Sequence, residues 1–390
     1  MKKTILASLL LVSGSLSAFS AEEAESLASD IQETTATPAK EKELFTKPKF
    51  SGYIIGQYNA NFKESDKSNS FSLRMIRLSV GGRILDDFEW KIQGQINGNT
   101  MTLGESPRIV DAFVEWQKLK TVRVKAGQFK RPFTFENPMN PIDQGFMGYA
   151  QNVMNLSGFT DRVGEHSSNG RDIGVQLQGD LFANAKGRAI AHYQIGVFNG
   201  QGINTKDVDN QKDVIGGAWI MPVKGMRIGG FGWIGSYARN GIWTEADGSQ
   251  AEGTRKVNRY RYAISAEYKC KGWEFRSEYI HHTGGAFATR HQQSADLKKA
   301  DFNEKIGDKA DGVYALCIAP VIPQKLKFKA RYDMYRPSAS WTTAKTQYEV
   351  GLNYSICKQI ELHAEYALVN DRSLAKHNYS IADMQMSVRF

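Results

Sequence analysis

The stretch from Phe88 to Asn97 reads Phe-Glu-Trp-Lys-Ile-Gln-Gly-Gln-Ile-Asn, and its apolar and polar residues alternate along its whole length. Successive side chains of a β-strand point to opposite faces, so this alternation predicts a strand with one apolar and one polar face. In a soluble sheet the apolar face would pack on a core. In a transmembrane barrel it would contact lipid, and the polar face would line water.

The same alternation recurs from Phe50 to the C-terminus, where sixteen segments fit the strand pattern. Other clear examples are 260–268, 325–334, 348–356, 360–368 and 380–390.

The connections between these segments alternate in length. Tight connections fall at 86–87, 118–121, 182–187, 222–225, 271–272, 320–324 and 358. Long polar connections fall at 63–69, 99–106, 129–170, 199–212, 239–256, 283–309, 336–345 and 370–378. An outer-membrane barrel has short turns at one end and long loops at the other, whereas the Greek-key crossings of a soluble sandwich give no such alternation. The sequence therefore predicts an all-β fold, a 16-stranded antiparallel up-and-down transmembrane β-barrel.

The first residues have the composition of an export signal. Lys2 and Lys3 precede a short apolar stretch and then small residues, which predicts a signal peptide over 1–20. Residues 21–48 are rich in Glu, Ala, Ser, Thr and Lys and predict a flexible or short helical periplasmic leader, followed by the barrel over 49–390. We therefore expect the protein in the outer membrane of a Gram-negative bacterium, in contact with its lipid.

The chain carries a net charge of +9 at pH 7. A basic balance suits anionic solutes, anionic lipid or nucleic acid, and nucleic acid agrees least with export. Cys270, Cys317 and Cys357 lie far apart without a CxxC spacing, so they predict neither a disulfide framework nor a metal site. The adjacent His281 and His282 would point to opposite faces of a strand. No cofactor and no catalytic residues are expected, and the chain is predicted not to be an enzyme.

Four segments resemble the phosphate-selective porin O and P family. They are Phe71–Leu78, Val110–Trp116, Gly127–Phe133 and Arg171–Asp180. The resemblance implies a homotrimer of sixteen-stranded barrels, in which inward arginines and lysines lead anions to a constriction at the third loop. The positions that match the family's basic motif are Arg74, Arg77 and Lys130.

The third loop is predicted at 129–170, the longest of the connections. A loop of this length in a compact protein is usually functional, and in sixteen-stranded porins the third loop folds inward and narrows the channel. Rings of Lys and Arg favour anions in a pore. The candidate constriction residues are Lys130, Arg131, Arg162 and Arg171. In the alternative interpretation, Arg162 and Arg171 pair with Asp161 or Asp172 and only hold the loop in place.

A row of basic residues occupies one face of the predicted strand 325–334, opposite Leu326, Phe328 and Tyr332. A Lys or Arg that faces lipid at the midplane costs ~2–4 kcal/mol, so we expect the basic face to meet water. The candidate pore-lining residues of the anion path are Arg74, Arg77, Lys91, Arg123, Lys125, Lys325, Lys327, Lys329 and Arg331.

These observations predict an outer-membrane porin for the passive diffusion of small anions, with phosphate as a candidate solute. A non-selective or weakly cation-selective porin is the first alternative, favoured if Glu361, Glu365 and Asp383 dominate the constriction. A barrel enzyme would need a Ser/His or Asp/His constellation on a rigid outer rim. An adhesin that binds a partner through the loop 283–309 is the remaining alternative.

Overall fold

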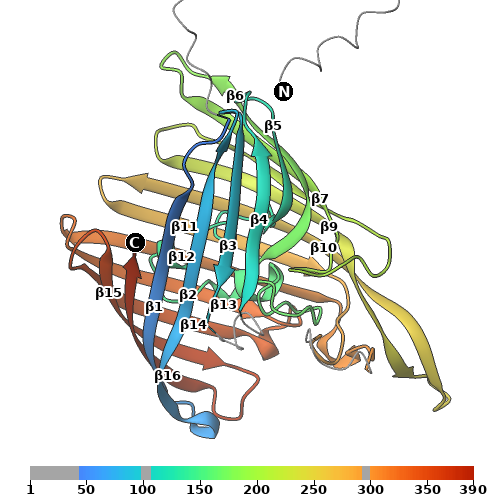
Figure 1. Ribbon diagram of the computed structural model, residues 1–390. Coiled ribbons are helices and arrows are strands. Elements are labelled where there is room, and N and C mark those ends of the chain that lie inside the picture. The colour runs from blue at the N-terminus through green and yellow to red at the C-terminus, as the bar shows by residue number, and fades with distance from the viewer. Residues whose placement is uncertain (1–43, 98–106, 292–298) are drawn as a thin grey trace, which may run out of the picture. The chain divides into compact units, whose positions relative to one another are not determined.

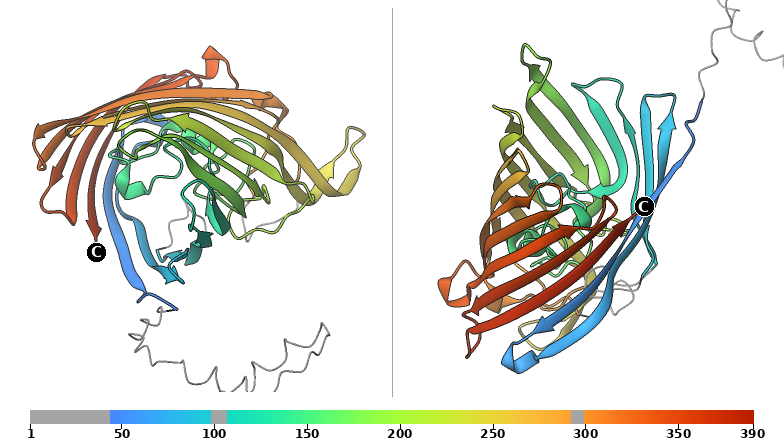
Figure 2. Two further views of the ribbon diagram at one scale, coloured as in Figure 1. Left: turned by 90° about the horizontal axis from the view of Figure 1, so that it is seen from above. Right: turned by 90° about the vertical axis from the view of Figure 1, so that its left-hand side faces the viewer.

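A closed barrel of sixteen antiparallel strands forms the described part of the chain in a computed structural model (Figure 1). The structure describes residues 44–97, 107–291 and 299–390. Each strand pairs with its neighbours in sequence, and β1 closes the barrel on β16, which lies beside it in Figure 2. The predicted fold class is therefore confirmed. The strands are β1 (Lys49–Asn61), β2 (Ser68–Ile84), β3 (Phe88–Gln95), β4 (Arg108–Trp116), β5 (Arg123–Lys130), β6 (Arg171–Ala183), β7 (Ala189–Phe198), β8 (Asp213–Ile220), β9 (Met226–Thr244), β10 (Gln250–Cys270), β11 (Trp273–Thr283), β12 (Lys309–Ile322), β13 (Leu326–Arg336), β14 (Lys345–Ser355), β15 (Ile360–Asp371) and β16 (Asn378–Arg389).

The strands divide their side chains between an outward and a luminal face. On β13, Phe328 and Tyr332 are exposed, whereas Lys329, Arg331 and Asp333 are buried. A strand that buries charge and exposes aromatic side chains has its outward face suited to lipid rather than water. The predicted faces of this strand are therefore confirmed.

Seven short turns connect alternate pairs of strands, close to the predicted positions. They occupy 85–87, 117–122, 184–188, 221–225, 271–272, 323–325 and 356–359. In the two-residue turn, Lys271 and Gly272 have φ angles of 49° and 88°. Positive φ at both positions is what a type I′ hairpin turn requires. The turn geometry thus sets the register of β10 on β11.

The predicted loop 239–256 is wrong. Strand β9 continues to Thr244 and β10 begins at Gln250, so only residues 245–249 connect them. The hairpin extends past the neighbouring strands in Figure 1. A strand beyond the bilayer meets water on both faces, so polar residues such as Asn240 no longer mark the end of a strand.

Residues 44–46 run beside the end of β2. Phe45 forms an antiparallel bridge with Ile84, and the Thr46 N–H donates to Arg83 O at 3.0 Å. The predicted signal peptide 1–20 and most of the predicted leader 21–48 lie outside the described residues.

Short helices occur only in the connections of the described ranges. They are η1 (Glu64–Asp66), η2 (Pro141–Asp143), α3 (Gln151–Leu156), η3 (Glu304–Ile306) and η4 (Trp341–Thr343). No helix among the described residues is long and apolar enough to cross a membrane.

Buried apolar side chains gather where the segment 131–170, which connects β5 to β6, meets strands β9–β13. The Phe133 ring lies 5.5 Å from the ring of Trp233 on β9, and both side chains are fully buried. Ile234, the next residue after Trp233, is 63% exposed and faces outward. Trp233 therefore lies on the luminal face, and the segment 131–170 contacts it there.

Candidate functional site

Arg74 and Arg77 both lie on the luminal face of β2, although residues three apart on a regular strand face opposite sides. The register between β1 and β2 shifts between Ile55 and Gly56, which leaves Arg74 as an extra residue on β2. Such a β-bulge re-aims side chains. The bulge is what brings the two predicted arginines to the same face.

The two arginines differ in their surroundings. Arg74 Nη1 donates to Gln385 Oε1 of β16 at 2.9 Å. Arg77 is fully buried, with its Nε 3.4 Å from Gln95 Oε1 and its guanidinium 5.9 Å from the centre of the Tyr53 ring. Among the described residues Arg77 has no carboxylate within ion-pair distance.

A cavity of about 260 Å³ lies against the luminal face of β3–β7. Four cationic side chains contribute to its lining, but only one carboxylate does. We call it the basic cavity. Its lining residues are Lys91, Asp111, Phe113, Lys125, Phe129, Lys130, Pro132, Pro138, Asn140, Arg171, Gln176, Gln178 and Gln194. All four of its cations are residues that the sequence predicts for the channel.

Three of these cations pair with carboxylates. Arg171 Nε and Nη2 donate to the two oxygens of Asp111 at 2.5 and 3.1 Å. Lys91 Nζ is 3.7 Å from Asp111 and Lys125 Nζ is 3.1 Å from Glu115. An ammonium group has three donors. Lys91 and Lys125 therefore keep donor capacity that can face the cavity, while the guanidinium of Arg171 is committed to Asp111.

Lys130 has no carboxylate partner among the described residues. Its ammonium donates to the main-chain oxygens of Asn137 and Met139 at 2.7 and 2.6 Å, and to Tyr149 Oη at 2.7 Å. The Tyr149 hydroxyl in turn donates to Met139 O. Burial raises the pKa of Tyr149, so its hydroxyl remains neutral beside the lysine. Lys130 ends β5 instead of belonging to the loop, and its ammonium group anchors the start of the segment 131–170.

Carboxylates gather on the opposite wall, where the main chain of the segment 131–170 donates to them. Glu278 Oε1 of β11 accepts from the N–H groups of Phe135 and Glu136 at 2.6 and 3.0 Å. Asp333 Oδ2 of β13 accepts from the Gln151 N–H at 2.9 Å. Both carboxylates are fully buried. The segment 131–170 therefore covers both carboxyl groups.

The basic row predicted on β13 is on the luminal face but is paired. Lys329 forms an ion pair with Glu365 and donates to Gly145 O at 2.9 Å. Arg331 Nε donates to Glu349 Oε2 at 2.5 Å, and its Nη1 donates to Gly148 O at 2.9 Å. Both side chains thus connect the wall to the segment 131–170.

The remaining predicted path residues lie nearer the short-turn end. Lys327 is half-buried on β13, whereas Lys325 lies in the exposed turn before this strand because β13 begins at Leu326. Arg123 at the start of β5 is 3.3 Å from Asp180. The structure therefore does not join these residues to the basic cavity.

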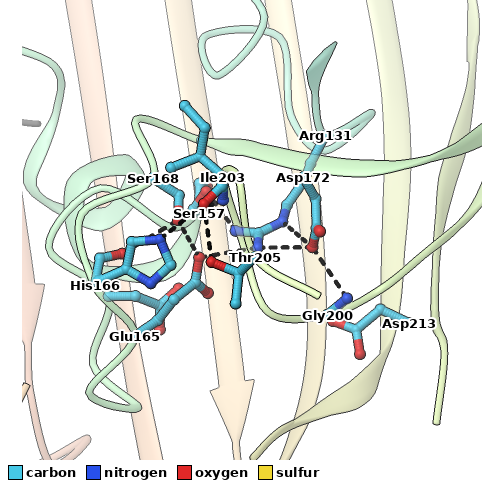
Figure 3. A network of polar contacts seen from close by, with 12 residues as sticks. Arg131, Ser157, Glu165, His166, Ser168, Asp172, Gly200, Ile203, Thr205 and Asp213 are labelled. Carbon is cyan, nitrogen blue, oxygen red and sulfur yellow. Dashed lines mark hydrogen bonds and ion pairs between the residues drawn. The ribbon is translucent and has the colours of Figure 1, made fainter. Parts of the chain in front are cut away.

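Arg131 belongs to a buried network of ion pairs (Figure 3). Its Nη2 is 2.9 Å from both Glu165 Oε1 and Asp172 Oδ2, and all three side chains are fully buried. Arg259 of β10 pairs with the other oxygen of Glu165 and, at 2.7 Å, with Asp213. Arg131 is thus a residue that holds the segment 131–170 against the wall.

Two further arginines of this region, Arg259 and Arg261 of β10, were not among the predicted site residues. Arg261 forms two hydrogen bonds with Asp161, at 2.8 and 2.7 Å. The guanidinium groups of Arg131, Arg259 and Arg261 lie 4.6–4.9 Å from the centre of the Trp233 ring. The alternation of β10 places Arg259 and Arg261 on the luminal face, so the sequence pattern could have predicted them as luminal residues.

Arg162 bonds to main-chain carbonyls. It donates to Gly284 O at 2.6 Å, to Pro337 O at 3.1 Å and also to Gly307 O. The structure therefore does not contain the alternative ion pairs of Arg162 with Asp161 or of Arg171 with Asp172. Arg162 holds the segment 131–170 to two other long connections.

Residues 52–210 match the family model described as phosphate-selective porin O and P. The resemblance predicted from the sequence is confirmed over this range. The barrel is similar to the anion-selective porin from Comamonas acidovorans, with a TM-score of 0.60, 13% identity and coverage of 88% of this chain and 98% of that one. It is also similar to the outer-membrane channel DcaP of Acinetobacter baumannii, with a TM-score of 0.57, 12% identity and coverage of 88% and 97%.

A third similar structure is the trimer form of OmpT from Vibrio cholerae, with a TM-score of 0.58, 11% identity and coverage of 88% and 99%. No curated protein sequence matches the chain. The chain has the fold of an outer-membrane porin, and this fold together with the family match points to a channel rather than an enzyme. In the described ranges no three His, Cys, Asp or Glu side chains gather as a metal ion would require.

Proposed function

We propose that this chain is an outer-membrane porin that passes small anions by passive diffusion through the basic cavity. The observation that carries the proposal is the lining of this cavity, with Lys91, Lys125, Lys130 and Arg171 against the single carboxylate of Asp111. Charged rings of one sign select ions of the other sign in a pore. The remaining donors of Lys91 and Lys125 would supply weak contacts, which conduction needs because the ion must also leave.

The segment 131–170 is, in this proposal, a loop that folds into the lumen and forms the constriction. Its main-chain N–H groups bond Glu278, Asp333 and, at Met147, Glu365. These N–H groups each bond one oxygen of a luminal carboxyl group, which a buried polar group requires. The loop thus removes the acidic wall from the path and leaves the basic wall facing the solute.

The same contacts weigh against a cation-selective pore. Glu365 also pairs with Lys329, and Asp383 accepts from the Asn59 amide. Two of the three acidic residues on which that alternative depends are therefore engaged by the protein.

Phosphate remains the candidate solute because the basic residues lie within the family match. Arg can bind phosphate oxygens in a bidentate manner, whereas Lys acts as a point charge. The homotrimer is supported by the trimer form of OmpT. Export through a signal peptide over 1–20, a leader over 21–48 and a Gram-negative outer membrane complete the proposal.

The test is the zero-current potential of the purified protein in a planar bilayer across a KCl gradient. We expect the wild type to prefer chloride, and the double variant Lys91→Glu/Lys125→Glu to lose or reverse this preference. Lys118→Glu is the matched control, because Lys118 is an exposed turn residue with 64% of its side chain accessible. An unchanged potential in the double variant would remove the basic cavity from the ion path.

A further inference from the structure

The basic cavity presents aromatic rings as well as charge. Phe113 of β4 and Phe129 of β5 both line it, together with Pro132 and Pro138. The two rings lie 6.2 Å apart in an edge-to-face arrangement. An inorganic anion has no apolar surface that could use these rings, so charge selection alone does not explain their position.

We propose that the basic cavity preferentially takes organic anions with a flat apolar body, of which an aromatic carboxylate is the simplest. This inference rests on the proposed function, since it assigns a substrate class to the same cavity.

The position of the carboxylate follows from the donors that remain available. Arg171 is committed to Asp111, and the three protons of Lys130 go to three oxygen acceptors. Lys91 and Lys125 each have a single carboxylate partner. A ligand carboxylate therefore binds at the ammonium groups of Lys91 and Lys125.

The position of the apolar body follows from Lys125. Its Nζ lies 4.5 Å from the centre of the Phe113 ring and 5.5 Å from that of Phe129. A carboxylate bound to this ammonium has its attached ring within reach of both phenylalanines. Aromatic pairs favour such offset or edge-to-face contacts.

The two phenylalanines divide their roles. Phe129 is buried and also contacts Phe198 at a ring distance of 5.5 Å, so it is part of the packing. Phe113 is only half-buried and leaves part of its ring open to the cavity. Phe113 is therefore the specificity residue to test.

The cavity also has room and a further polar group for a larger solute. Its volume of about 260 Å³ exceeds the space of several waters, since one water occupies roughly 30 Å³. The Gln194 side-chain amide has no hydrogen bond with the described residues and lines the cavity. It can serve a polar substituent at the far end of the ligand.

The experiment compares how benzoate, acetate and inorganic phosphate block the chloride current of single channels in a planar bilayer. We expect benzoate to block at about 2- to 12-fold lower concentration than acetate, the range that one aromatic contact of about 0.5–1.5 kcal/mol supplies. Phe113→Ala should abolish this difference, and Phe113→Leu should reduce it while keeping apolar volume. Val114→Ala is the matched control, because Val114 is exposed on the outward face of the same strand.

Each outcome has a separate meaning. Three results would overturn the inference. They are equal block by benzoate and acetate in the wild type, stronger block by phosphate than by benzoate, and full benzoate preference in both Phe113 variants. The zero-current potential in KCl is recorded on the same channels. If Phe113→Ala retains the anion preference, only the ring contact was lost. If the wild type shows no anion preference, the proposed function itself is contradicted.

Discussion

Replacing Glu165 by Gln should release the segment 131–170 from the barrel wall. Glu165 is fully buried, and its Oε1 accepts from Arg131 Nη2 at 2.9 Å and from Ser168 Oγ at 2.7 Å. Its Oε2 pairs with Arg259. The substitution keeps the size of the side chain but removes the charge between two buried guanidinium groups.

The expected magnitude follows from the cost of breaking a buried ion pair. Removing one partner costs about 3–5 kcal/mol, because the other charge is left uncompensated. Arg131 keeps Asp172 and Arg259 keeps Asp213, so we expect the lower part of this range. At about 1.4 kcal/mol per tenfold change, the ratio of docked to released loop falls by roughly two orders of magnitude or more.

Two measurements report this release. Single-channel conductance should rise or fluctuate between levels, because release of the proposed constriction from the lumen widens the path. Limited proteolysis of the folded barrel should cut within 131–170 faster than in the wild type. Glu64→Gln is the control, since Glu64 pairs with Lys376 at an exposed loop. A Glu165→Gln protein with wild-type conductance and wild-type protease resistance would refute the idea that this network holds the constriction.

Two further predictions concern the same segment. Arg162→Met should leave the carbonyls of Gly284, Gly307 and Pro337 without their donor and destabilise loop docking by about 3 kcal/mol. The noise of the single-channel current should therefore increase in this variant. Arg162→Lys should recover part of the loss. Burial lowers the pKa of His166 to about 4 from an ordinary value near 6.5. The contribution of His166 to stability should therefore fall by about 3 kcal/mol as the pH drops from 6.5 to 4, because in this range mainly the unfolded state takes up the proton. Unfolding midpoints at pH 7.5 and 5 check it, and His166→Gln should flatten the dependence; equal slopes for both proteins would contradict it.

The strand faces and most turns could be predicted from the sequence because they depend on local rules. On β13, Lys329 and Arg331 had to face the lumen, since either one facing lipid costs ~2–4 kcal/mol. The rule holds only where lipid is present. Beyond the bilayer a strand can have polar side chains on both faces. The outer part of the β9–β10 hairpin was therefore predicted as a loop.

Only the tertiary structure decided which of the predicted cations line the basic cavity. The sequence ranks Lys125 and Lys329 alike. Strand pairing and loop docking join Lys329 to Glu365 and to the segment 131–170, whereas Lys125 pairs with Glu115 and lies beside the half-buried Phe113 ring of the basic cavity. The bulge at Arg74 likewise depends on how β2 pairs with β1. Alternation is set by neighbours two residues apart in the chain, whereas ion pairing is set by residues tens to hundreds of positions apart, and no local pattern records those distances.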